Sequence, residues 1–277
     1  MKFDAVLFDL FDTLILVEKD KDFNTLCLKK LHEFFVKEGI NVSFDYFKRV
    51  YSETLHRLYS EADKNFSEPH FNLRVLHVLK QLGHNASISD PIVTEGTAVF
   101  AREFMRYVHL DDEALGVLQK LHAKYRLGLI SNFAIPECAQ TLLERFGLNE
   151  FFDVILVSGE INKRKPSHEI FERALTTLDV NPSRAVFIGD TPSLDIEGAK
   201  NVGMTTILVE RIRPNRFGDA KPDRLVRSLR NLLETIVDAK PQKLVRSFRE
   251  LPERIVPIKP DWRIRSLKEL LTILEDC

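Results

Sequence analysis

Four short polar motifs carry the side chains of this sequence that could do chemistry together. Each follows a short apolar run with the character of a buried strand. Parallel strands have their carboxyl ends at one edge of an open α/β sheet, which is where ligands bind, so the four loops should converge on one pocket. They would bring carboxylates, a hydroxyl group and an ammonium group into it. The motifs are Asp9-Leu-Phe-Asp-Thr13, Ser131-Asn132, Lys165-Pro166 and Gly189-Asp190-Thr-Pro-Ser-Leu-Asp195.

Each of these motifs is a weak signal by itself. An aspartate at a strand end often only begins a turn, and Ser131 could simply cap one. Lys165 could be an exposed lysine at the start of a helix, and Asp195 alone has the character of a helix surface residue. The prediction of a site therefore rests on their shared position after successive strands.

The motifs need a parallel sheet to position them, and the sequence predicts one. Short runs made up almost entirely of apolar residues indicate strands that are buried on both faces of a sheet. From about residue 110 they alternate strictly with helical patterns, such as the stripe that ends at Gly147. This alternation predicts a three-layer, Rossmann-like α/β core. The expected strands are 3–8, 126–130, 153–157, 185–188 and 205–209.

Residues 15–108 have a different pattern, with amphipathic helices and no expected strand. One helix should open near Asp22 or Asn24, and a second should start from Ser43. A third should run from about Pro69 to Leu82, and a fourth should start at Asp90-Pro91, a cap followed by proline at the first helical position. An all-helical domain inserted after the first strand is therefore expected, with the core formed by residues 1–14 and 109–237.

The tail of the chain contains an internal repeat. Three similar units begin at Lys221, Lys240 and Lys259, 19 residues apart, and each reads as a short extended piece, a serine cap and a helix. Pro252 falls inside the helix of the middle unit. We expect the core to end with the first unit and residues 238–277 to be duplicated strand–helix repeats. The sequence leaves open whether the extra copies add to the sheet edge, pack on a partner or merely persist.

The order and spacing of the four motifs resemble those of the haloacid dehalogenase superfamily of hydrolases. The resemblance covers about residues 3–237, and the helical insert falls where that superfamily carries its helical cap. It implies a Rossmann-like catalytic core and a reaction that proceeds through a covalent intermediate on an aspartate.

The resemblance also implies a role for individual residues. Asp9 would be the nucleophile, Lys165 would neutralise charge on it and on the transition state, and Ser131 would hold phosphoryl oxygens. Thr13 and Asn132 belong to the same motifs and are expected to contribute to substrate binding.

A Mg²⁺ ion is the cofactor that the resemblance implies. Its ligands would be Asp9, the main-chain carbonyl of Phe11 and Asp190, all hard oxygen donors. Asp195 would lie behind them and pair with Lys165 or with a water on the metal. A carboxylate can approach a phosphate dianion only when a metal and a lysine have cancelled charge.

Phe11 departs from the superfamily pattern. Phosphatases of this superfamily usually have a second aspartate two residues after the nucleophile, which protonates the leaving group. Thr13 keeps its usual place four residues after Asp9, so no residue has been inserted and Phe11 occupies the acid's position. Asp12 faces the pocket or caps the turn, and we favour the turn.

Three functions follow from this pattern. The leading one is a Mg²⁺-dependent phosphatase that hydrolyses a small phosphorylated metabolite or an acyl phosphate. The second is a metal-free 2-haloacid dehalogenase, which needs no proton donor but usually has a neutral residue in place of Asp190. The third is a non-catalytic binding protein. The retained polar residues of all four motifs argue against it: Asp9, Ser131, Lys165, Asp190 and Asp195.

Composition limits the partners. The chain has 40 Lys and Arg against 41 Asp and Glu, so its charge favours neither nucleic acid nor a membrane. No apolar stretch approaches the roughly 20 residues of a membrane span. Three widely spaced cysteines, Cys27, Cys138 and Cys277, suit the cytoplasm. We therefore expect a cytoplasmic protein with a small-molecule substrate and leave its oligomeric state open.

Overall fold

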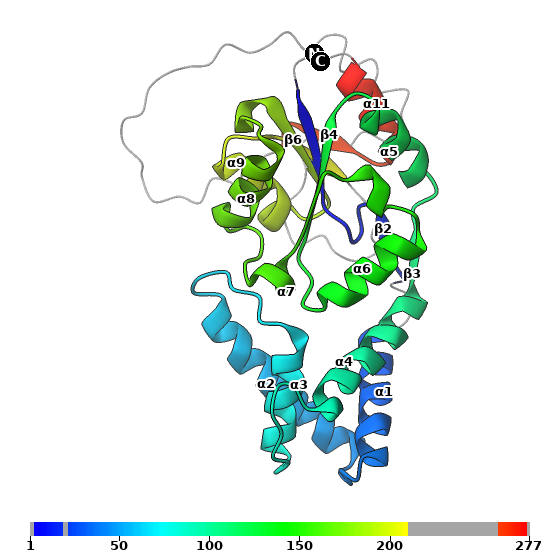
Figure 1. The fold of residues 1–277 in the computed structure, drawn as a ribbon, viewed down its shortest axis with the longest axis vertical. Helices are drawn as coiled ribbons and strands as arrows, with labels where there is room; N and C mark the ends of the chain where they lie inside the picture. Colours follow the sequence, from blue (N-terminus) through cyan, green and yellow to red (C-terminus); the bar gives the residue numbers. More distant parts are fainter. Residues whose placement is uncertain (1–2, 19–21, 210–259, 276–277) are drawn as a thin grey trace, which may run out of the picture.

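A parallel sheet forms the centre of the larger of the two parts seen in Figure 1. The computed structural model describes residues 3–18, 22–209 and 260–275. Within them the sheet has six strands in the order β5-β4-β1-β6-β7-β8, and all neighbours run parallel. The strands are β1 Ala5–Phe8, β4 Arg126–Ser131, β5 Val154–Val157, β6 Ala185–Gly189, β7 Thr205–Val209 and β8 Trp262–Ile264.

Both faces of the sheet are covered, which explains why its strands are continuously apolar. Along β1, Val6 and Phe8 join the apolar cluster on one face, whereas Ala5 and Leu7 join the cluster on the other. The three-layer α/β core predicted from the sequence is therefore confirmed. Its helices are α5 Ala114–His122, α6 Pro136–Arg145, α7 Ser158–Ile161, α8 His168–Leu178, α9 Glu197–Asn201 and α11 Leu267–Glu275. Short turns of helix are η1 Met105–Tyr107, η2 Asn149–Phe151, η3 Pro182–Arg184 and η4 Pro192–Ile196.

The order of the strands creates a ligand-binding position beside β1. The chain builds outward from β1 to β4 and β5, then crosses back to β6 on the other side of β1. Connections on the two sides therefore diverge at the carboxyl end of β1, and such a switch point leaves a crevice. Asp9 is the first residue after β1, and its backbone N–H donates to Ile188 O in β6 at 2.8 Å.

Four helices form the smaller part at the bottom of Figure 1: α1 Phe23–Lys37, α2 Phe44–Ala62, α3 Phe71–Gln81 and α4 Pro91–Phe104. The N-caps expected at Asp22 and Ser43 are present, and their side chains accept the backbone N–H groups of Thr25 and Tyr46. Asp90 stands at the N-cap of α4, but its carboxylate bonds to Ser87 instead.

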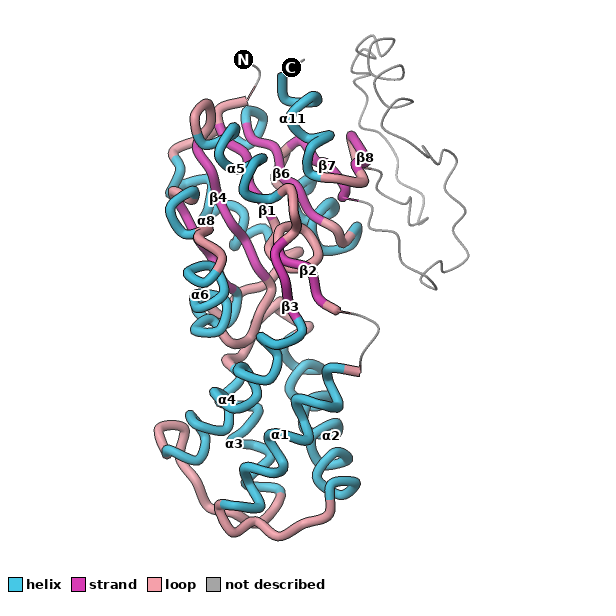
Figure 2. The backbone as a smooth tube through the Cα atoms, turned by 90° about the vertical axis from the view of Figure 1, so that its right-hand side faces the viewer, coloured by secondary structure: helices cyan, strands magenta, loops and turns pink. Residues whose placement is uncertain are grey.

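A two-stranded ribbon joins the two parts, where no strand was expected. Strand β2 (Ile15–Val17) pairs antiparallel with β3 (Val108–Leu110), and Figure 2 shows the ribbon between the sheet and the helices. The sequence window around β2 could not reveal it, because three residues give too short a pattern and the partner strand lies far along the chain. The chain leaves and re-enters the core through this ribbon.

The third tail repeat completes the sheet. Its extended piece is β8, which pairs with β7, and its helix α11 packs against α5. We expected the core to end at residue 237, whereas the structure places residues 262–275 in it. Ser266 precedes α11, but its buried hydroxyl has no hydrogen-bond partner within residues 3–18, 22–209 and 260–275. The first turn is held instead by Glu269, whose carboxylate accepts the N–H of Arg265 at 3.1 Å. The first two repeats lie outside the described residues.

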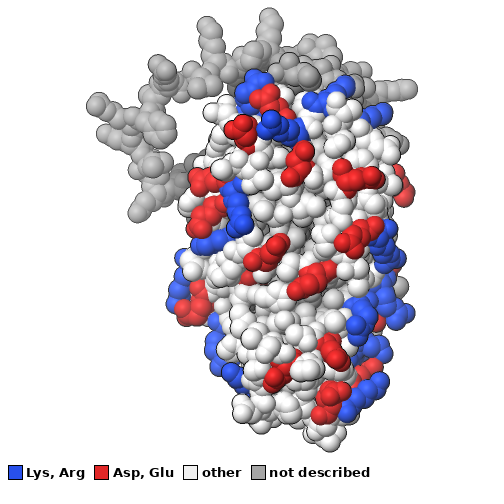
Figure 3. All heavy atoms as spheres, in the orientation of Figure 1, with Lys and Arg blue, Asp and Glu red and all other residues white. Residues whose placement is uncertain are grey.

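Charges of both signs are interspersed on the face of the molecule that Figure 3 shows, in keeping with the nearly balanced composition. Among the described residues, none of the helices combines the length and apolar composition needed to cross a membrane. Cys27 and Cys138 are buried free thiols, and burial raises the pKa of each to about 12.

Deletions in the tail should separate the third repeat from the other two. Among the described residues, truncation after Ala239 removes five buried apolar side chains, each contributing about 1.5–3 kcal/mol to stability. Together they rival the roughly 5–15 kcal/mol of a typical domain. We expect that truncation to give aggregated protein or a strongly lowered Tm. The lost side chains are Ile264, Leu267, Leu270, Ile273 and Leu274.

Deletion of residues 221–258 is the matched control, because it removes two whole repeats and keeps the third. Scanning calorimetry should give a Tm within a few degrees of the parent protein, that is, a change below about 1 kcal/mol. Equal stability of the Ala239 truncation would show that another repeat can take the place of the third.

Candidate active site

A buried lysine lies between two carboxylates at the carboxyl end of the sheet. The Lys165 side chain is 2% exposed, and its Nζ lies 2.6 Å from Asp9 Oδ1 and 2.7 Å from Asp195 Oδ1. It also donates to Ile130 O at 2.8 Å. An ammonium group has three N–H donors, and these three oxygens match that number. The three charged residues therefore form one compact ionic unit.

Local structure brings Asp195 into this unit. It lies in the first turn after β6, and its Oδ2 accepts the backbone N–H of Thr191 at 2.9 Å. Gly189 makes the approach possible, since a Cβ there would lie 2.5 Å from the carboxyl group of Asp195. The glycine in the fourth motif is thus required by the position of the aspartate.

The carboxylates outnumber the cation. One carboxylate oxygen from each of Asp9, Asp190 and Asp195 lies within 4.8 Å of the others, with Lys165 as the cation in contact. Burial raises the pKa of Asp9 to about 7; Lys165 opposes this rise, and Asp195 and Asp190 add to it. Burial lowers the pKa of Lys165, but Asp195 and Asp9 outweigh it, so the net shift is upward. A site with this excess of carboxylate oxygens fits a divalent cation.

Thr13 contacts Asp9, and Ser131 lies in β4, the strand next to β1. Thr13 is fully buried, and its hydroxyl donates to Asp9 Oδ2 at 3.2 Å, so it orients the carboxylate. Ser131 ends β4 and is also fully buried, yet its Oγ has no hydrogen-bond partner among the described residues. A buried hydroxyl without a partner is costly, and it is explained if a ligand oxygen supplies the missing bond.

Asn132 connects two of the predicted motifs. Its side-chain Oδ1 accepts the backbone N–H of Lys165 at 2.8 Å, and its Nδ2 donates to Lys165 O at 3.0 Å. We expected Asn132 to contribute to substrate binding, and the structure shows both ends of its amide holding the Lys165 loop. A further contact with substrate stays a prediction.

Phe11 belongs to an aromatic cluster at the boundary between core and helices. Its half-buried ring lies with its centroid 4.8 Å from that of Phe133 and 5.6 Å from that of Phe104 in α4, which in turn contacts Phe23 of α1. Asp12 has a left-handed backbone (φ +60°), and its Oδ1 accepts the N–H of Val17 at 3.4 Å. The environment around Phe11 is therefore apolar, and Asp12 serves the turn, as we favoured.

Sequence reasoning missed a set of residues that joins the helical part to the Lys165 loop. Arg164 pairs with Asp63 and lies near Glu68, both from the helical part. Glu68 is 5% exposed. The sequence feature that could have indicated this contact is Arg164, a charged residue directly before the predicted catalytic lysine. Its partners, however, lie far away in the sequence.

The fold and this charged site define a class of hydrolase. The model of the haloacid dehalogenase-like hydrolase family matches residues 3–203, and the chain belongs to that family. The chain is 30% identical over 204 residues to a glyceraldehyde 3-phosphate phosphatase of Pyrococcus abyssi, covering 73% of this chain and 79% of the relative. It is 31% identical over 134 residues to a phosphoserine phosphatase of Thermus thermophilus, covering 48% of this chain and 53% of the relative.

Solved structures share the fold. A 2-haloacid dehalogenase from Pseudomonas syringae has a TM-score of 0.66 at 23% identity, with 99% of each chain covered. A phosphatase of the same superfamily from Thermococcus onnurineus has a TM-score of 0.59 at 23% identity, with 98% of each chain covered. Since both kinds of enzyme share the fold, the fold does not distinguish between their reactions.

Substitutions in the ionic unit should affect stability unequally. Lys165→Met leaves two buried carboxylates, Asp9 and Asp195, without their cation, which we expect to cost on the order of 3–5 kcal/mol in metal-free protein at pH 8. Asp9→Asn keeps the Lys165–Asp195 pair and relieves repulsion, so its Tm should equal or exceed that of the parent. Calorimetry in the presence of a chelator measures both. A less stable Asp9→Asn protein would contradict the inferred excess of negative charge.

Proposed function

We propose that this hydrolase is a Mg²⁺-dependent phosphatase that acts on a small phosphorylated metabolite through a phosphoryl intermediate on Asp9. The observation that carries the proposal is the Asp9–Lys165–Asp195 unit with Asp190 beside it, together with the Ser131 hydroxyl, which has no hydrogen-bond partner among the described residues. The relatives named as phosphatases support it. We also expect a cytoplasmic location.

Asp9 supplies the nucleophile in the proposed reaction. One of its carboxylate oxygens bonds to phosphorus while the bond from phosphorus to the leaving oxygen breaks. Lys165 neutralises charge on the carboxylate and on the phosphoryl oxygens as they approach, and Ser131 donates a hydrogen bond to one of those oxygens. Water then bonds to phosphorus, the bond to Asp9 breaks, and phosphate leaves with the protons of the water.

Asp9, Asp190 and the main-chain carbonyl of Phe11 would hold the Mg²⁺, with Asp195 behind them. A bound Mg²⁺ supplies positive charge that lets an anionic phosphate approach a carboxylate. Asp195 keeps its contact with Lys165, so the lysine stays charged and in place. Asp190 is the residue that distinguishes a Mg²⁺-dependent phosphatase from a metal-free 2-haloacid dehalogenase.

A 2-haloacid dehalogenase is the second candidate, and the apolar environment of Phe11 favours it. A halide leaves without a proton, so no acid is needed at this position. Release of phosphate from an aryl phosphate with Mg²⁺, measured beside chloride release from 2-chloropropionate with a chelator, distinguishes the two. Chloride release alone would overturn the phosphatase proposal, and Asp9→Asn should be inactive in either assay. Absence of both activities would support a binding protein.

Mg²⁺ binding should depend on pH and on Asp190. The pKa of Asp9 is raised from 3.8 to about 7, so its proton stabilises the metal-free fold below about pH 4, and this contribution is lost as the pH rises through 7. Mg²⁺ competes with that proton, so the increase in Tm caused by Mg²⁺ should be larger at pH 8 than at pH 5. Asp190→Ala should abolish the increase and the phosphatase activity. An increase that is independent of both would place the metal elsewhere.

Phe11 should make the rate depend steeply on the leaving group. A general acid contributes about 10²–10⁴ to the rate when the leaving group is poor, and Phe11 can donate no proton. We therefore expect aryl and acyl phosphates to be cleaved faster than alkyl phosphates. Phe11→Asp should accelerate alkyl phosphates more than aryl ones, as shown by the ratio of kcat/KM values. Equal rates for alkyl and aryl phosphates in the parent protein would mean that another group, with Asp12 the first to test, donates the proton.

A further inference from the structure

The segment between α2 and α3 reaches down to the loop that carries Lys165. The backbone N–H of Arg164 donates to Phe66 O at 2.9 Å, and Lys163 Nζ donates to Asn65 O at 3.1 Å. Both core residues lie within two positions of Lys165. The helical part therefore contacts the lysine loop directly through the main-chain carbonyls of Asn65 and Phe66.

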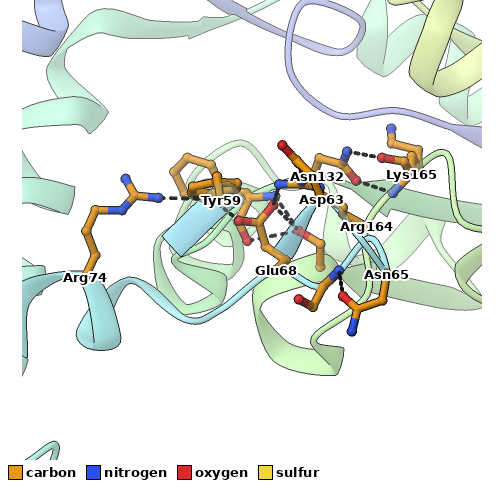
Figure 4. A network of polar contacts seen from close by, with 11 residues as sticks. Tyr59, Asp63, Asn65, Glu68, Arg74, Asn132, Arg164 and Lys165 are labelled. Carbon is orange, nitrogen blue, oxygen red and sulfur yellow. Dashed lines mark hydrogen bonds and ion pairs between the residues drawn. The ribbon is translucent and has the colours of Figure 1, made fainter. Parts of the chain in front are cut away.

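The Arg164 side chain strengthens this contact. It is 13% exposed, its guanidinium carbon lies 4.8 Å from the centre of the Tyr59 ring, and it pairs with Asp63 at the end of α2. Its Nη1 lies 4.0 Å from Glu68 Oε2. In Figure 4 these side chains gather on one side of the Lys165 loop. The pair with Asp63 is exposed and contributes little, so the stacking and the buried Glu68 dominate.

Glu68 extends the contact to a second loop, residues 132–133, which follows β4. Its Oε1 accepts a hydrogen bond from the hydroxyl of Tyr59, and its Oε2 lies 3.5 Å from Ser158 Oγ. That Oγ accepts the backbone N–H of Phe133 at 2.9 Å. Phe133 follows Asn132, whose amide holds the backbone of Lys165. Glu68 is thus joined to the Lys165 loop by two routes, one through Arg164 and one through Ser158.

Burial makes these partners mutually dependent. A buried carboxylate is stable only where polar partners replace its lost water, and burial raises the pKa of Glu68 despite the opposing effects of Tyr59 and Arg164. Its partners come from α2, from the Lys165 loop and from the start of α7. The set is complete only when the 63–68 segment is seated on the core.

We propose that Arg164 and Glu68 are positioning residues that couple the seating of segment 63–68 to the placement of Lys165 against Asp9. The expected effect on turnover rests on the proposed phosphatase function. The coupling between segment 63–68 and Lys165 is a property of the protein without substrate and does not rest on it. When the segment lifts, Arg164 loses Tyr59 and Glu68, and the lysine loop loses two of its supports. The site is then assembled for chemistry only in the seated state.

Four variants test this proposal. Arg164→Ala removes the contact, Arg164→Lys keeps the charge, Glu68→Gln keeps the shape without the charge, and Arg173→Ala on α8 is an exposed control. With an aryl phosphate and Mg²⁺, Arg164→Ala should lower kcat by about 10- to 100-fold, as misplacement of a catalytic group does, with KM changed by less than about threefold. Arg164→Lys should recover part of the rate, and Arg173→Ala should equal the parent.

Two further measurements distinguish positioning from a general loss of structure. The double variant Arg164→Ala/Glu68→Gln should lose kcat by a smaller factor than the product of the two single-variant factors, because both residues act through one network. NMR amide exchange without substrate should show the Lys165 N–H exchanging at least about tenfold faster in Glu68→Gln, with the β1 and β6 amides unchanged.

Multiplicative effects on kcat together with an unchanged Lys165 amide would overturn the proposal. Equal acceleration at β1 and β6 would also overturn it, because it would indicate general destabilisation. If the parent protein hydrolyses no phosphate ester, the proposed function fails, while the amide exchange still decides the coupling.

Discussion

The buried contact of Lys165 with Asp9 and Asp195 is the interaction on which the rest of this structure depends. A lysine ammonium group with 2% exposure is tolerable only because carboxylates on two different strand ends and one backbone carbonyl surround it. The parallel order of β4, β1 and β6 brings those groups to one point. The sheet therefore positions the carboxylates of Asp9 and Asp195, and the ammonium group of Lys165 stabilises them at its carboxyl end.

The same unit explains why a hydrolytic reaction suits the site. The carboxylates exceed the cations, which disfavours an anionic substrate until further positive charge arrives. A divalent cation would correct the imbalance and free Asp9 from its proton. The buried Ser131 hydroxyl at the end of β4 has no hydrogen-bond partner in the part of the chain that the structure describes, so it can donate to a ligand oxygen. In this view the acidic site lacks positive charge that the proposed Mg²⁺ would supply.

The helical part contributes in two ways. Its α4 helix supplies Phe104 to the aromatic cluster around Phe11, so the region where a leaving group would depart is apolar. Its 63–68 segment contacts the loop of the lysine. Phe104 therefore helps to make the environment of Phe11 apolar, while segment 63–68 contacts the loop that carries Lys165. The helical part is joined to the core through the β2–β3 ribbon, which connects the two parts that make these contacts.

Sequence alone determined the α/β core, its strand positions, the helical insert and the convergence of four motifs on one edge. Those features follow from the local hydrophobic pattern, which a sequence shows directly. Their convergence follows from the general geometry of parallel sheets. Tertiary structure decided the rest. The β2–β3 ribbon, the choice of the third repeat as β8, and the contacts of Arg164 with Tyr59 and Glu68 all join residues distant in the chain. Such pairings depend on which surfaces meet after folding, and no local pattern of residues specifies them.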